Sequence, residues 1–138
     1  MRKFIAALLA TGVLTMMPVY GHHAFQSEFD WKKPTTLLGS ITKVDWVNPH
    51  AQVTVDAKDD HGVAGTWTVE MGNPTTLTRY GWTQNLMKVG DKVSIDGWMA
   101  KDGSKRVNAK SVTLSDGRER FAASSFFDMK ATADDDGS

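Results

Sequence analysis

An alternation of apolar and polar residues over residues 37–114, interrupted only once, constrains this fold more than any other feature of the sequence. Apolar side chains at every second position are typical of strands that bury one face. Turn signals divide the alternating region into five segments, which are residues 37–47, 51–57, 66–71, 93–98 and 106–114. The interruption carries helix signals instead, with Asn73 suited to an N-cap, Pro74 to the first turn and Gly81 to the position after the last turn. The sequence therefore predicts five strands, with one short helix over 74–80 between the third and the fourth.

The order of these elements is that of the OB-fold, a five-stranded antiparallel barrel. Gly39, inside the long first strand, is expected to mark a bulge or bend where that strand coils around the barrel. A small β-sandwich is the alternative interpretation, but it would not explain the helix. The side chains that should meet in the core are Val53, Val55, Trp67, Val69, Val93 and Ile95. We therefore predict an all-β fold of OB type with a small helical component.

The first 21 residues have the order of basic, apolar and small residues that marks a secretory signal peptide. A short basic start is followed by an apolar run over residues 4–14, and Gly21 precedes the cut that we expect ahead of His22. Spanning a bilayer takes about 20 apolar residues, so this run is too short for a membrane anchor. We expect a periplasmic or secreted protein with no membrane span after processing. The predicted domains are the signal peptide over 1–21, an N-terminal segment over 22–36, the barrel over 37–122 and a flexible acidic tail over 123–138.

The charge balance and the absence of cysteine exclude several classes of protein. Lys and Arg number 16 and Asp and Glu also number 16, so the chain lacks the basic excess typical of nucleic-acid binders. No cysteine is present to form a disulfide or to act as a nucleophile, so the core alone must hold an exported domain together. The sequence has no G-x-S-x-G, H-E-x-x-H or phosphate-loop motif, and Glu28, Asp30 and Glu70 show no paired spacing. We predict a binding protein rather than an enzyme, with no nucleic acid as partner and no feature that names a protein partner.

The histidines at the predicted mature N-terminus are candidates for a metal site. An N-terminal His22 offers its α-amine and its imidazole to one ion, because an α-amine with a pKa of about 8 loses its proton readily near neutral pH. His23 offers a second imidazole, and His50, in a turn fixed by Pro49, offers a third. Nitrogen ligands suit Cu(II), Zn(II) and Ni(II), and copper leads the order of affinity. We predict that His22, His23 and His50 bind one divalent ion, Cu(II) before others; the alternative is a polar terminus and a His50 side chain that caps its turn.

Three of the five tryptophans are candidates for a ligand-binding aromatic face. Barrels of OB type often bind oligonucleotides or sugars on exposed aromatic side chains. Trp98 shares its strand face with polar residues, whereas Trp46 and Trp82 flank the turn and the helix end. The alternative is a role in the core or as plugs of the barrel, since large aromatic side chains mostly serve burial. The second function that we consider is therefore a metal-free binding module for a sugar, a small molecule or a protein partner.

Short motifs, spread in order along the predicted mature chain, carry a resemblance to a known family. They are HHAF at 22–25, EFD at 28–30, WVNPHA at 46–51, GNP at 72–74, RYGW at 79–82, AKDGS at 100–104 and LSDGR at 114–118. On these motifs the chain resembles domain of unknown function 6152, a family of small exported bacterial proteins, from His22 to about Ala122. The resemblance implies export and a small β-barrel, and it implies no activity or ligand.

Overall fold

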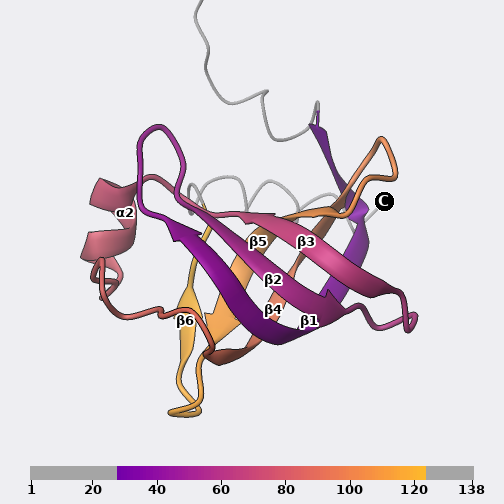
Figure 1. Ribbon diagram of the computed structural model, residues 1–138. Helices are drawn as coiled ribbons and strands as arrows, with labels where there is room; N and C mark the ends of the chain where they lie inside the picture. Colours follow the sequence, from indigo (N-terminus) through magenta and orange to yellow (C-terminus); the bar gives the residue numbers. More distant parts are fainter. Residues whose placement is uncertain (1–27, 124–138) are drawn as a thin grey trace, which may run out of the picture.

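Six strands and one helix make up the part of the chain that the computed structural model describes, residues 28–123 (Figure 1). In chain order they are β1 (Phe29–Asp45), β2 (Gln52–Lys58), β3 (Ala64–Glu70), α2 (Pro74–Arg79), β4 (Lys92–Ala100), β5 (Arg106–Thr113) and β6 (Glu119–Phe121). The protein is therefore mostly β, as predicted, and its helix lies between the third and fourth strands. No helix within these residues is long and apolar enough to cross a membrane.

All six strands belong to one sheet, in the order β3-β2-β1-β4-β5-β6, and neighbours in this order are antiparallel. β3 also pairs with β5, in parallel, over residues 68–70 and 106–108. The pairings of β1, β2, β3, β5 and β4 therefore form a closed cycle, with β6 outside it on β5. One consequence for the functional site is that the end of β3, with Glu70, lies beside the start of β5, with Arg106.

β1 is longer than the alternation predicts, since it starts at Phe29 instead of residue 37. Phe29 and residues 34–36 pair with β4, so part of the predicted N-terminal segment over 22–36 belongs to the sheet. The residues between them lack apolar alternation, which is why the sequence pattern does not reveal this part of the strand. β6 is also absent from the prediction, because three residues are too few to show a period.

Gly39 has a different role from the bulge or bend that we expected. Its pairings with Ala57 on β2 and with Val93 on β4 are regular, whereas the register shift between β1 and β2 lies further along β1. A Cβ atom at residue 39 would lie 2.6 Å from the Cα atom of Ala57, which is far inside normal contact. Gly39 therefore allows β1 to approach β2 closely, and a residue with a side chain would push the two strands apart.

The predicted core and helix are confirmed. The six side chains expected in the core are each at most 6% exposed, and they are Val53, Val55, Trp67, Val69, Val93 and Ile95. At the start of α2, Asn73 Oδ1 accepts a hydrogen bond of 2.8 Å from the backbone N–H of Thr76. After its last residues, Gly81 has a φ of 89°, the left-handed conformation that favours glycine. The capping signals thus place the helix correctly, and its fully buried Leu77 joins it to the core.

Candidate functional site

Of the three histidines predicted to bind metal, the structure places His50, whereas His22 and His23 lie outside the described residues. His50 lies at the end of the β1–β2 loop. The next residue, Ala51, donates a backbone hydrogen bond of 3.0 Å to Gly72 and accepts one of 2.8 Å from Met71. These two bonds hold the loop against the end of β3. Within residues 28–123, no group of three or more His, Asp or Glu side chains is arranged to hold a metal ion.

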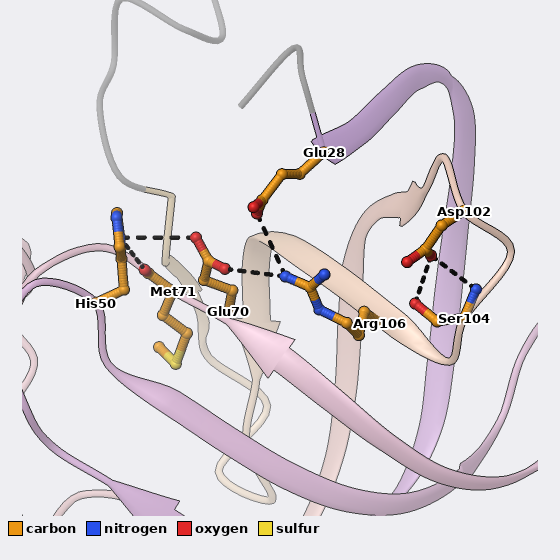
Figure 2. A network of polar contacts seen from close by, with 7 residues as sticks. All are labelled: Glu28, His50, Glu70, Met71, Asp102, Ser104 and Arg106. Carbon is orange, nitrogen blue, oxygen red and sulfur yellow. Dashed lines mark hydrogen bonds and ion pairs between the residues drawn. The ribbon is translucent and has the colours of Figure 1, made fainter. Parts of the chain in front are cut away.

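The His50 ring is oriented by the backbone of Met71, the residue that follows β3. Its Nδ1 atom lies 3.2 Å from the carbonyl oxygen of Met71. A carbonyl oxygen only accepts hydrogen bonds, so Nδ1 carries the hydrogen and the lone pair of the neutral ring is on Nε2. Figure 2 shows the other ring nitrogen pointing away from Met71 and from Glu70. The side chain as a whole is 37% exposed.

A chain of ionisable side chains connects His50 to the start of β1 (Figure 2). Glu70 Oε1 lies 3.8 Å from His50 Nδ1, and Glu70 Oε2 lies 3.8 Å from Arg106 Nη2. Arg106 Nη2 also donates a hydrogen bond of 3.3 Å to Glu28 Oε2. We call Glu28, His50, Glu70 and Arg106 the Glu70 network. The sequence offers the two acids as candidates but not Arg106. Glu70 and Arg106 meet through the parallel pairing of β3 with β5, and Glu28 is placed beside them by its backbone contact with Lys101, just after β4.

Arg106 is held from two sides. Its guanidinium carbon lies 5.3 Å from the centre of the Phe29 ring, which is within the range of a cation–π interaction. In the β4–β5 turn that precedes it, Asp102 Oδ1 accepts hydrogen bonds from the Ser104 hydroxyl, at 2.6 Å, and from the Ser104 backbone N–H, at 2.9 Å (Figure 2). These two bonds lower the pKa of Asp102 below its ordinary value. The turn is thereby fixed, and with it the position from which Arg106 reaches the two glutamates.

Glu70 is the most buried member of the Glu70 network, with a side chain that is 17% exposed. Burial raises the pKa of Glu70 above its ordinary value, because the charged carboxylate loses hydration. The charges of His50 and Arg106 favour the ionised form, the charge of Glu28 opposes it, and burial is the largest effect. Glu70 therefore holds its proton to a higher pH in the folded protein than in the unfolded chain.

We expect the variant Glu70→Gln to gain stability relative to the wild type as the pH rises. Because the folded-state pKa of Glu70 is raised, the wild type loses stability as the pH rises through that pKa, whereas glutamine stays neutral. Free energies of unfolding from urea titrations between about pH 4 and pH 7 measure the difference. Glu28→Gln is the control, because the Glu28 side chain is more than half exposed. A difference that stays constant or shrinks as the pH rises contradicts the burial effect.

The three tryptophans predicted as ligand contacts differ in their surroundings. Trp82 is 0% exposed, and its indole N–H donates a hydrogen bond of 2.7 Å to the carbonyl oxygen of Phe121. Its ring belongs to the core, which agrees with the alternative that this tryptophan serves burial and not ligand contact. Trp46 is half-buried and packs against the core, whereas Trp98 is half-buried on β4 and lines a groove. Of the three, Trp98 has the surroundings of a ligand contact.

One protein-family model matches most of the chain. The family described as "Family of unknown function (DUF6152)" has a model that matches residues 11–109. The chain belongs to DUF6152. No curated protein and no solved structure matches it. The DUF6152 match confirms the resemblance seen in the sequence, and it includes all four residues of the Glu70 network together with His22 and His23.

Proposed function

We propose that this DUF6152 protein is exported, as a periplasmic or secreted protein, and binds divalent copper through its mature N-terminus and His50. The observation that carries the proposal is the way the His50 ring is held. Its Nδ1 donates to the Met71 carbonyl, and its Nε2 points away from Met71 and Glu70 on a side chain that is 37% exposed (Figure 2). Metal-binding histidines commonly have this arrangement, because a hydrogen bond from one ring nitrogen fixes the tautomer and the direction of the other.

The segment over residues 22–27 is long enough to bring His22 and His23 to His50. Glu28 follows that segment and is connected to His50, through Arg106 and Glu70, by contacts of 3.8 Å or less. Five extended residues span at most about 18 Å, which is the length of chain from His23 to Glu28. The Glu70 network therefore supports the proposal by attaching the segment at the same edge of the sheet as His50.

The nitrogen ligands of the proposed site suit copper. The α-amine and the imidazole of His22 would form a chelate, His50 Nε2 would supply a second imidazole to complete the set of nitrogens called a histidine brace, and His23 would add a further imidazole. The tether between the first two nitrogens offsets part of the entropy that an N-terminal segment loses on ordering, about 1–2 kcal/mol per residue. Because amines and imidazoles bind metal only when deprotonated, affinity should fall as the pH drops through the range in which imidazole takes up protons.

We also propose that the fold is an OB-type barrel. The closed cycle of pairings among β1 to β5 and the helix between β3 and β4 support this assignment. The parallel pairing of β3 with β5 favours it over a β-sandwich, since that pairing joins the two ends of the five-stranded order.

A single residue added before His22 should weaken Cu(II) binding at least about tenfold, or ~1.4 kcal/mol. The extension moves the free α-amine away from the His22 imidazole but leaves every side chain in place. His50→Ala should weaken binding by a similar factor. His61→Ala is the matched control, because its imidazole is 75% exposed in the β2–β3 turn. Calorimetric titration of the processed protein with Cu(II) and Zn(II) measures these affinities, after the intact mass confirms that the chain starts at His22.

Equal Cu(II) affinity in the wild type, the extended chain and His50→Ala would falsify the copper site. A mature mass that retains Met1, or that starts after Ala24, would contradict the processing step and the copper site together.

A further inference from the structure

A groove of about 280 Å³ lies on the outer side of the sheet, with walls from β1, β4, β5, β6 and the β2–β3 turn. It is more enclosed than the two depressions beside the exposed side chain of Leu38. Its lining includes Trp98 and no member of the Glu70 network. The groove therefore calls for an explanation separate from that of His50.

The strands depart from regular pairing where they line this groove. Beside the groove, the β4–β5 register shifts between Asp96 and Gly97 and leaves Lys110, one of the lining residues, as the extra residue on β5. Bulges of this kind redirect side chains and are frequent beside binding sites. The groove is thus shaped by a specific irregularity of the sheet.

Three hydroxyl–carboxylate pairs fix the polar side of the groove. Thr35 donates to Asp60 at 2.9 Å, Thr36 to Asp96 at 2.5 Å and Ser111 to Glu119 at 2.7 Å. Each carboxylate keeps a second oxygen, which is able to accept further hydrogen bonds. The lining is therefore rich in acceptors that the protein itself holds in place.

The charges of the lining limit which ligands can bind. The carboxylates of Asp60, Asp96 and Glu119 repel an anion such as a sugar phosphate or a uronic acid. Lys110 offsets one of the three carboxylate charges and also supplies N–H donors. A neutral ligand with many hydroxyl groups satisfies the acceptors and the lysine at once.

We propose that this groove binds a neutral sugar, one pyranose ring at a time. Trp98 supplies an aromatic wall against which the C–H face of a ring can pack, while the ring hydroxyls donate to the carboxylates opposite. The volume is close to the lower limit of small-molecule pockets, about 300 Å³, which suits one ring rather than a chain of several. The site is independent of the proposed copper ligands, because it shares no residue with them.

The proposal is tested by calorimetric titration of the processed protein, from His22 to its C-terminus, with three sugars in the presence of EDTA. The sugars are D-glucose, D-galactose and N-acetyl-D-glucosamine. We expect saturable binding of at least one sugar, weakened about tenfold or more by Trp98→Ala and by Glu119→Gln. Leu38→Ala is the matched control, because Leu38 is exposed on a different part of the sheet and should leave the affinity unchanged. Circular dichroism and the melting temperature establish that each variant is folded. Glu119→Gln keeps the shape of the side chain, so it tests the site even where Trp98→Ala does not fold.

Three results would overturn the sugar site. One is the absence of saturable binding for all three sugars, and another is binding that neither Trp98→Ala nor Glu119→Gln weakens. The third is binding of ethanolamine without binding of any sugar, which would assign the groove to organic cations. Because EDTA removes copper, failure here leaves the copper site standing, and failure of the copper site leaves this one standing.

Discussion

Replacing Gly39 with alanine is expected to lower the free energy of unfolding by about 3 kcal/mol, the upper end of the usual cost of overpacking. The added methyl group would lie 2.6 Å from the Cα atom of Ala57 and closer still to the carbonyl oxygen of Asp56. Both obstructing atoms belong to the backbone of β2, so no side-chain rotation relieves the clash. β1 pairs with β2 and β4 on either side of Gly39, and separating the strands breaks hydrogen bonds of the sheet. Urea titration followed by tryptophan fluorescence measures the loss.

Gly62→Ala provides the control for the clash at Gly39. A Cβ atom at Gly62 meets nothing within 4 Å, but the residue has a φ of 81°. Its replacement should therefore cost only the strain of a left-handed backbone, about 1 kcal/mol. Equal losses in the two variants would mean that β1 and β2 separate easily at Gly39 and that the close approach contributes little.

Trp82→Phe is expected to lower the free energy of unfolding by about 3 kcal/mol. Trp67→Phe is expected to lower it by about 2 kcal/mol less than Trp82→Phe does. Both indoles are at most 1% exposed, and both variants remove the same atoms from the core. The Trp82 N–H donates to the Phe121 carbonyl at 2.7 Å, so its loss removes a hydrogen bond between the core and β6. Within the described residues, Trp67 Nε1 is buried without a hydrogen-bond partner. Phenylalanine at residue 67 thus removes an unsatisfied donor, which offsets part of the lost packing.

The comparison of the two tryptophans depends only on their N–H groups. Chemical denaturation of both variants, with equal m-values as the check that the denatured states match, gives the difference directly. An equal loss in Trp67→Phe and Trp82→Phe contradicts the prediction, and it would indicate that the Trp67 N–H also has a partner in solution.

The sequence by itself determined the strands that alternate and the helix that is capped. Val53 and Val55 are buried where their period places them, and Asn73 caps α2 as its position before Pro74 predicts. These features depend on neighbours in the chain, because the period of a strand and the hydrogen bonds of a cap are local. The same reasoning does not reveal the start of β1 at Phe29 or the short β6, whose residues pair with distant strands without an apolar period of their own.

Only the tertiary structure decided the composition of the candidate sites. Glu70 and Arg106 are far apart in the sequence, and they meet because β3 and β5 pair in parallel. The direction of His50 Nε2 follows only from the carbonyl of Met71, which holds Nδ1. Likewise, the residues next to Trp82 and Trp98 in the sequence make both of them candidates for ligand contact. Only the structure shows that Trp82 is buried and that Trp98 lines a groove. Pairings between strands distant in the chain depend on how the whole sheet closes, and no period or motif within one strand carries that information.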